Sequence, residues 1–268
     1  MSEKLLDHLP ALCNQVRRIA LEAGEVTLDY FDDAGFEGAD AKADGSPVTL
    51  ADQKAEEVIE KALKDILPDV KVVGEEAVAD GYRPQLEGVE HFWLVDPLDG
   101  TKEFISGSGD YTVNIALIKN GTPVMGVVYA PTKGELFAAA GEGTAIRWTD
   151  ESEKDRPISV REAPREGLTV VASLNHSNDE KLEKFLADYK VQKLMKRGSS
   201  LKICAVAMGK ADLYPRLGPT CEWDTAAGHA ILLGAGGIMT DIDNKPLTYG
   251  GADPKFLNPE FIASSGLI

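Results

Sequence analysis

Apolar residues recur at helical spacing in two segments near the start of the chain. Over residues 4–32 they stand three or four positions apart, and over residues 49–67 a second set follows the same rule. Such spacing places the apolar side chains on one face of a helix. The two segments therefore predict a pair of long amphipathic helices. The Gly- and Asp-rich residues 36–46 between them predict a loop or a short hairpin.

Short runs of apolar and β-branched residues follow the second helix. They predict strands at residues 70–74, 92–96, 111–118, 124–129, 136–140 and 145–148. Lys119, Asn120 and Gly121 separate the third and fourth of these runs, and Asn-Gly is a strong hairpin signal. We therefore predict an antiparallel sheet beside the helix pair.

The pattern changes after the charged residues 151–156. Further strands are predicted at residues 168–172, 191–195 and 211–214, and helices at residues 178–189, 200–208 and 224–233. Alternating helices and strands are typical of an α/β layer arrangement. The sequence thus predicts an N-terminal part, residues 1–155, and a C-terminal α/β part, residues 156–268, that together form one compact unit.

The composition is that of an ordinary globular protein, with 43% hydrophobic and 27% charged residues among 268. The formal net charge of −16 argues against a nucleic-acid polymer as partner, because such binding needs Lys and Arg to neutralise phosphates. The longest apolar run, residues 230–239, is far shorter than a membrane span. Residues 1–4 lack the basic start of a secretory signal, so neither a signal nor a transmembrane segment is expected.

The cysteines and histidines narrow the chemistry further. Cys13, Cys204 and Cys221 are odd in number and form no Cys-x-x-Cys pair, so we expect a reducing cytoplasm and neither a disulfide nor a structural zinc site. The histidines are scattered, which argues against a histidine-based transition-metal site. They are His8, His91, His176 and His229.

The most informative segment is the apolar run that ends in carboxylates at residues 93–101, Trp-Leu-Val-Asp-Pro-Leu-Asp-Gly-Thr. Pro97 cannot donate to a strand ladder, so the chain should turn there and present Asp96 and Asp99 together. Carboxylate oxygens at close quarters suit Mg²⁺ or Mn²⁺. Gly100 lets the backbone approach an anion, and the Thr101 hydroxyl can orient water. The segment therefore predicts metal-assisted phosphate chemistry.

Two alternatives apply to the same segment. Asp, Pro and Gly are the usual residues of turns, so the motif alone could be a turn with Asx-type hydrogen bonds. It also resembles the Asp-x-Asp-Gly-Thr motif of phosphatases that form an aspartyl-phosphate. Here the two carboxylates are one residue further apart, which favours a metal-held water over a phospho-aspartate nucleophile.

Two acidic features precede this segment. Gly74-Glu75-Glu76 follows a predicted strand, so Glu75 could bridge a metal and a water, although Glu pairs in surface loops are common. Thr49 and Asp52 have the capping-box spacing at the start of a helix, which requires no catalytic role. Asp52 could also hydrogen bond with Thr101, so that the threonine hydroxyl accepts a proton from water.

Two further features follow it. Asp224, in the Trp-Asp-Thr-Ala-Ala-Gly of residues 223–228, is expected to open a helix, either as its cap or as a ligand near bound phosphate. The small residues after it would let this helix pack close to the site. Residues 197–202, Arg-Gly-Ser-Ser-Leu-Lys, predict a strand-to-helix turn. That turn is either a simple cap by Ser199 or Ser200 or a contact to an anion or a ribose phosphate.

In this chain order the motifs resemble those of the Mg²⁺-dependent, lithium-sensitive phosphatases of the inositol monophosphatase superfamily. The resemblance rests on residues 74–76, 93–101 and 223–228 and runs over residues 5–265. Within the superfamily, further stretches resemble the 3′(2′),5′-bisphosphate nucleotidases of the CysQ type. They are residues 109–118, 198–202, 213–216, 218–220, 246–247 and 256–259.

The resemblance implies a fold and a metal centre. The fold would be the layered αβαβα sandwich of the inositol monophosphatase and fructose-1,6-bisphosphatase type. Two or three Mg²⁺ ions would bind, with Mn²⁺ as an alternative and Li⁺ as an inhibitor. Glu75, Asp96 and the backbone carbonyl of Leu98 would hold the first ion. Asp96, Asp99 and Asp224 would hold the second, and a third, weaker ion would be shared near Glu75.

The resemblance also implies roles in catalysis and substrate binding. Thr101 and Asp52, with Glu75, would orient the attacking water, and the backbone N–H groups of Gly100 and Thr101 would hold the phosphate. Lys202 or Arg216 would meet a 5′-phosphate, and His229 is a further candidate on the nucleotide side. The candidate substrate contacts are Glu75, Leu98, Asp99, Gly100, Thr101, Gly198, Ser199, Ser200, Lys202, Arg216 and Asp224.

The implied reaction is hydrolysis of the 3′-phosphate of adenosine 3′,5′-bisphosphate to AMP and phosphate, in sulfur assimilation and nucleotide recycling. Two rivals stay open: an inositol or sugar monophosphatase with the same metals, and a non-catalytic sensor of metal and nucleotide. We expect a cytoplasmic monomer or homodimer that acts as one catalytic unit. Peripheral contact with the cytoplasmic face of the inner membrane is an alternative that the negative charge disfavours.

Overall fold

The computed structural model describes residues 2–33, 40–41, 47–48, 50–173, 180–251 and 253–266. Thr49 with its predicted cap, His176, and the first two residues of the helix predicted at 178–189 lie outside the described residues. Of the loop or hairpin predicted at residues 36–46, the structure describes the strand β1 (Asp40–Ala41), which pairs with β2 (Pro47–Val48) just beyond the predicted range.

The single helix predicted over residues 4–32 is two helices. α1 (Ser2–Leu6) ends before Asp7, and α2 (Leu9–Leu28) starts again after His8. Pro10 lies in the first turn of α2, where its missing N–H leaves no hydrogen bond unmade. In the middle of one continuous helix the same proline would remove a hydrogen bond and clash with the preceding turn, so the helix restarts there. α3 (Leu50–Ile66) matches the second predicted helix.

The first sheet has seven strands in the order β3-β4-β5-β6-β7-β8-β9. They are β3 (Lys71–Gly74), β4 (His91–Asp99), β5 (Thr112–Lys119), β6 (Thr122–Ala130), β7 (Glu135–Ala139), β8 (Ile146–Thr149) and β9 (Arg156–Pro157). The prediction of an antiparallel sheet was wrong at one pair, because β3 and β4 are parallel. The short helix α4 (Glu75–Ala79) and the loop after it carry the chain back, so β4 starts beside β3 in the same direction.

β4 does not end at Asp96, as predicted, but continues through Pro97 to Asp99. Against β5, Asp96 pairs with Asn114 and Asp99 with Thr112, so three steps along β4 oppose two steps along β5. The extra residue is a β-bulge, and Pro97 lies inside it, where no ladder hydrogen bond is required of it. In a regular strand residues three apart point to opposite faces. The bulge therefore turns Asp99 to the same face as Asp96.

The second sheet has five strands in the order β11-β10-β12-β14-β13. They are β10 (Leu168–Ser173), β11 (Val191–Arg197), β12 (Leu213–Arg216), β13 (Ile238–Asp241) and β14 (Phe261–Ser264). The first three match predicted strands, whereas the last two were not predicted. β10 runs parallel to β11 and β12, and β14 runs antiparallel to both of its neighbours.

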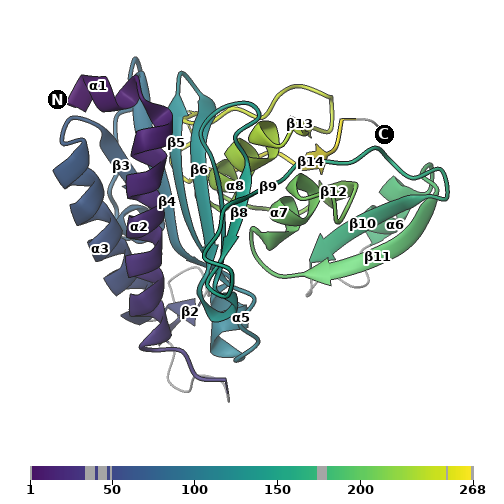
Figure 1. Cartoon of the computed structure of the whole chain (residues 1–268), viewed down its shortest axis with the longest axis horizontal. Coiled ribbons are helices and arrows are strands. Elements are labelled where there is room, and N and C mark those ends of the chain that lie inside the picture. The colour runs from purple at the N-terminus through teal and green to yellow at the C-terminus, as the bar shows by residue number, and fades with distance from the viewer. Residues whose placement is uncertain are drawn as a thin grey trace.

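Five layers follow from these elements. α2 and α3 cover one face of the first sheet, and α7 (Leu201–Ala207) and α8 (Glu222–Gly234) lie between the two sheets (Figure 1). α6 (Glu180–Leu186) packs with Phe185 and Leu186 on Leu168 of the second sheet, on the side away from α7 and α8. The order helix, sheet, helix, sheet, helix confirms the predicted αβαβα sandwich.

The apolar core crosses the boundary predicted between the two parts of the chain. One buried cluster joins Val73 and Leu94 of the first sheet to Ile231 of α8 and Ala263 of the second sheet. α8 approaches the first sheet closely, because Gly126 of β6 leaves room that a Cβ would take from the Ala227 carbonyl oxygen. The division at residue 155 stays a prediction.

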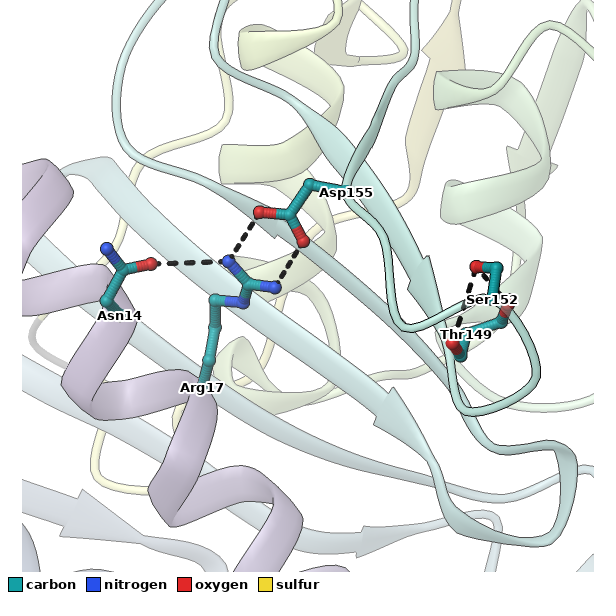
Figure 2. Close-up of polar contacts among 5 residues, drawn as sticks. All are labelled: Asn14, Arg17, Thr149, Ser152 and Asp155. Atoms are coloured by element: carbon teal, nitrogen blue, oxygen red, sulfur yellow. Dashed lines mark hydrogen bonds and ion pairs between the residues drawn. The ribbon is translucent and has the colours of Figure 1, made fainter.

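Two ion pairs tie connecting segments to the layers. Arg17 of α2 holds Asp155, in the loop before β9, at 2.5 and 3.0 Å, and also contacts Asn14, as Figure 2 shows. Arg161, before β10, donates two 2.8 Å hydrogen bonds to Asp212, which is fully buried and also accepts from the backbone N–H of Thr169. The exposed pair Arg17–Asp155 contributes little to the free energy of unfolding. The pair Arg161–Asp212 compensates the buried charge of Asp212.

α8 carries a buried histidine. His229 is 3% exposed, and its Nδ1 lies 2.9 Å from the Tyr249 hydroxyl, which also donates to Thr225. Burial lowers the pKa of His229 from 6.5 to about 3. The ring therefore stays neutral in the folded chain over a pH range in which the same ring takes up a proton in the unfolded chain.

We predict that His229 makes the protein less stable as the pH falls below 6.5. Between pH 6.5 and about 3 the unfolded chain binds one more proton at this residue than the folded chain, so stability is lost with falling pH. By pH 5 this loss amounts to about 2 kcal/mol. Urea unfolding of the native chain and of His229→Gln at pH 7.5 and pH 5 measures it. The variant should lose less stability on acidification, and parallel losses would contradict the prediction.

Candidate active site

Asp224 is held at the start of α8. The helix begins at Glu222 with Cys221 as its N-cap, so Asp224 is the third helical residue and not the first, as predicted. The reason is a capping box in which the Asp224 carboxylate reaches back and accepts the Cys221 N–H at 2.9 Å. The carboxylate therefore lies at the positive end of the helix dipole with one oxygen fixed.

Asp99 is held by the turn that precedes α7. Its Oδ2 accepts hydrogen bonds from the Ser200 N–H at 2.6 Å and from the Ser200 hydroxyl at 3.0 Å. The same hydroxyl lies 2.7 Å from the backbone carbonyl oxygen of Asp224. Ser200 is the N-cap of α7 but makes no side-chain cap bond, because its hydroxyl serves these two aspartates. One serine thus joins the motif at residues 93–101 to the motif at residues 223–228.

Asp96 lies behind Asp99 and is 1% exposed. Its Oδ1 accepts the Leu98 N–H at 3.0 Å within the bulge. Burial raises the pKa of Asp96 well above its ordinary value, and the neighbouring charges raise it further; these belong to Glu75, Asp99, Asp224 and Asp52. Burial, Asp99 and Glu75 raise the pKa of Asp224 in the same way. The fold therefore gathers the predicted ligand carboxylates within electrostatic reach of one another.

Glu75 is the first residue of α4 and is partly exposed. The start of α4 is held by Glu56 of α3, whose carboxylate accepts the N–H groups of Glu76 and Ala77 at 2.9 and 2.7 Å. Gly74 leaves room for this contact, because a Cβ at that position would overlap the Glu56 carboxylate. The Gly-Glu-Glu segment is therefore not a loose surface loop but a helix start held by a buried acid.

This donor set fits hard divalent cations. All of its side chains are carboxylates, which Mg²⁺ and Mn²⁺ prefer, and their mutual repulsion calls for positive charge. In the structure they do not converge on one point: within the described part of the chain, no three Asp, Glu, His or Cys side chains form a metal-ligand group. Instead, a carboxylate oxygen of each of Asp96, Asp99 and Asp224 accepts a hydrogen bond from a backbone N–H group. Such donors orient ligand carboxylates in metal centres.

The predicted water-orienting pair lies next to the carboxylates. Asp52, on α3, is fully buried and close enough to Asp96 to raise its pKa. Thr101 starts α5 (Thr101–Ile105), and its hydroxyl donates to the Leu98 carbonyl oxygen at 3.3 Å. Gly100 has φ 99°, and a Cβ there would lie 3.1 Å from the Asp110 carbonyl oxygen, so glycine is required in this turn.

A cleft of about 340 Å³ opens beside these residues. Of the predicted site residues, its lining contains Asp99, Gly100, Ser199, Ser200, Lys202, Arg216 and Asp224. Asp52, Asp96 and Leu98 are buried behind it, and Gly198 is buried in the turn beside it. The fold thus brings Asp99, Asp224 and the candidate nucleotide contacts to one cavity, whereas Glu75 and Thr101 are not part of its lining.

Two basic side chains, Lys202 and Arg216, also line the cleft. Lys202 is buried, with its Nζ 2.5 Å from the Ser199 carbonyl oxygen and 5.6 Å from the ring centre of Tyr214. Burial lowers the pKa of Lys202, and Asp99 partly offsets this. Arg216 donates to the Pro219 carbonyl oxygen at 2.9 Å, while its buried Nε has no hydrogen-bond partner among the described residues. Both side chains keep donors for an anion.

Some residues at the site were missed, and one candidate lies elsewhere. Lys102 lines the cleft, and its place directly after Thr101 was the available signal. Asn258, in a stretch that carried the resemblance, was given no role. Its amide donates to the Cys221 carbonyl oxygen at 2.6 Å and the Thr225 hydroxyl at 3.0 Å, which fixes the start of α8. His229 is not part of the cleft lining but is buried against Tyr249.

Known proteins agree with this architecture. CysQ from Escherichia coli strain K12, a 3′(2′),5′-bisphosphate nucleotidase, is 44% identical over 256 residues, which cover 94% of this chain and 99% of that protein. The enzyme of the same name from Salmonella typhimurium is 45% identical over 253 residues, covering 93% and 98%. The crystal structure of CysQ from Bacteroides thetaiotaomicron superposes with a TM-score of 0.77 at 38% identity, covering 96% and 97%.

The family model gives the same result. Residues 11–264 match the model of the inositol monophosphatase family, a span that includes both sheets and every predicted ligand. Together with relatives above 30% identity over nearly the whole chain, this match shows that the chain belongs to the inositol monophosphatase family.

Proposed function

We propose that the chain is a Mg²⁺-dependent 3′(2′),5′-bisphosphate nucleotidase that hydrolyses the 3′-phosphate of adenosine 3′,5′-bisphosphate to AMP and phosphate. The observation that carries this proposal is that carboxylates and basic side chains line the same cleft. They are Asp99, Asp224, Lys202 and Arg216. A substrate with two phosphates can use both kinds of group, whereas an inositol or sugar monophosphate has no second phosphate for Lys202 and Arg216.

The carboxylates would hold the cations. Glu75, Asp96 and the Leu98 carbonyl oxygen are the proposed ligands of one ion, and Asp96, Asp99 and Asp224 those of a second, with a third shared near Glu75. Bound divalent cations would supply an activated water and neutralise charge on the phosphoryl oxygens. Li⁺ would inhibit by occupying one of these positions. The support is the all-carboxylate donor set and its mutual repulsion.

The remaining groups of the chain would position the reactants. Thr101, backed by Asp52, would orient the attacking water, and the N–H groups of Gly100 and Thr101 would hold the 3′-phosphate. The water oxygen forms a bond to phosphorus as the bond to the ribose 3′ oxygen breaks, and the ribose oxygen takes up a proton. The glycine at this position supports this role. Its positive φ favours glycine, and a glycine leaves the turn without a side chain.

Lys202 and Arg216 would bind the 5′-phosphate. Both side chains line the cleft together with Asp99 and Asp224, so one cavity offers basic groups for one phosphate and carboxylate-held cations for the other. The planar guanidinium of Arg216 suits a charged hydrogen bond to a phosphate. Ser199 and Ser200 line the same cleft. This arrangement supports recognition of a bisphosphate nucleotide over a monophosphate ester.

Location and assembly are proposed on separate grounds. None of the helices in the described residues has the length and apolar character needed to cross a membrane. Cys13, Cys204 and Cys221 are free thiols, which fits the proposed reducing cytoplasm. A monomer or homodimer, and peripheral contact with the inner membrane, remain the predictions made from the sequence.

The decisive assay compares phosphate release from adenosine 3′,5′-bisphosphate and from inositol 1-phosphate. With Mg²⁺ present we expect faster turnover of the nucleotide, because only that substrate uses Lys202 and Arg216. EDTA should abolish the activity, and Li⁺ should inhibit it. Faster turnover of the inositol ester would retain the metal centre but refute the nucleotide assignment. Tight nucleotide binding without turnover would indicate the non-catalytic sensor.

Asp96→Asn should reduce phosphate release at least ~100-fold, a loss of about 3 kcal/mol of transition-state stabilisation. The reason is that Asp96 is the proposed ligand shared by both ions. The metal-free variant should unfold in urea no earlier than the native chain, because a neutral side chain removes repulsion from Glu75 and Asp99. Asp243→Asn, in an exposed turn, is the matched control. An unchanged rate for Asp96→Asn would refute the metal assignment.

Arg216→Gln should raise the KM for adenosine 3′,5′-bisphosphate about 10-fold or more, since a hydrogen bond to a charged group contributes about 1.5–3 kcal/mol. The KM for adenosine 3′-monophosphate, which lacks the 5′-phosphate, should hardly change. Steady-state kinetics on both nucleotides measure the difference, with the exposed Arg18→Gln as control. Equal losses on both substrates would place Arg216 away from the 5′-phosphate.

A further inference from the structure

Asn114 stands on the strand next to the ligand carboxylates. It pairs directly with Asp96 across the β4–β5 ladder, so the two side chains project from the same face of the sheet. Asn114 is 1% exposed and does not line the cleft, which excludes direct contact with a substrate. What it does at the site must therefore act through a neighbouring residue.

Three side chains in and just before β5 contact three consecutive residues of the turn before α7. Asp110 accepts the Gly198 N–H at 3.2 Å, Thr112 contacts the Ser199 hydroxyl at 3.3 Å, and Asn114 Nδ2 donates to the Ser200 hydroxyl at 2.9 Å. Side chains two apart along a strand share a face, which explains the matching order. Of the three contacts, the one made by Asn114 reaches the serine that joins Asp99 to Asp224.

The hydrogen-bond roles of Ser200 follow from this contact. A hydroxyl has one proton to donate and two lone pairs with which to accept. The Asn114 amide can only donate through Nδ2, so Ser200 accepts there and keeps its proton for Asp99 or for the carbonyl of Asp224. Without Asn114 the hydroxyl could rotate away, and the proposed ligands Asp99 and Asp224 would lose their common support.

The other half of the amide points to the same role. Asn114 Oδ1 is buried and has no hydrogen-bond partner among the described residues. A buried acceptor left unpaired destabilises the folded chain, so an apolar residue of the same size would suit the interior better. The unpaired Oδ1 therefore destabilises the fold, while the other half of the same amide makes the hydrogen bond to Ser200.

We propose that Asn114 is a positioning residue of the metal centre, which orients the Asp99 carboxylate and fixes the backbone of Asp224 through the Ser200 hydroxyl. The inference rests on the proposed metal-dependent function. It differs from that function in assigning Ser200 to the support of the carboxylates instead of to the substrate. Outer contacts of this kind typically change metal affinity 10- to 100-fold when they are removed.

The test is calorimetric titration of the metal-free chain with Mg²⁺. Asn114→Leu, which keeps the number and branching of the side-chain heavy atoms but removes the donor, should weaken Mg²⁺ binding about 10-fold or more. Its urea unfolding midpoint without metal should equal or exceed that of the native chain, because the unpaired Oδ1 is gone. A purely structural residue would instead lose stability. Asn114→Ala serves as a second variant, since it cannot overpack the interior.

A double-mutant cycle tests the route through Ser200. Ser200→Ala should weaken Mg²⁺ binding by itself, and adding Asn114→Leu to it should cause no further loss. Asn14→Leu, at an exposed asparagine of α2, is the control and should bind Mg²⁺ as the native chain does. Unchanged affinity in both Asn114 variants, or additive losses in the cycle, would overturn the inference. Failure of the native chain to bind Mg²⁺ would overturn the proposed metal site itself.

Discussion

The site depends on a single extra residue in β4. Because Asp96 and Asp99 are three apart, a regular strand would place them on opposite faces of the sheet. The bulge at Pro97 and Leu98 restores the second carboxylate to the face of the first, opposite Asn114 and Thr112. That face is covered by α7 and α8, which bring Ser200 and Asp224 to the same place. Without the bulge, Asp99 would point toward the layer of α2 and α3.

Placing several carboxylates close together is unfavourable, and hydrogen bonds from backbone N–H groups partly offset this repulsion. Asp96 and Asp224 are buried beside like charges, so their pKa values rise. Backbone N–H groups of Leu98, Cys221 and Ser200 each hold one of the acids. These donors come from the bulge, from the cap of α8 and from the turn before α7. The acids are therefore held by parts of the chain that lie about a hundred residues apart in sequence, as Asp99 and Ser200 do.

The cleft collects charged groups from separate parts of the fold. Asp99 ends β4 and Asp224 lies near the start of α8. Lys202 lies on α7 and Arg216 ends β12. Carboxylates and basic side chains therefore meet in one cavity, although they come from four different elements.

Much of this was determined by the sequence alone. Helical spacing, alternating strands and the Asn-Gly turn were enough to predict α3 and the hairpin of β5 and β6. The motifs at residues 74–76, 93–101 and 223–228 identified the candidate ligand carboxylates. Local patterns sufficed there because periodicity and turn chemistry depend on near neighbours. Only the tertiary structure decided the parallel β3–β4 pair, the bulge, and the place of Asp224 within its helix. It also decided which polar residues support the acids, because Asn114 and Ser200 meet only when two layers pack together.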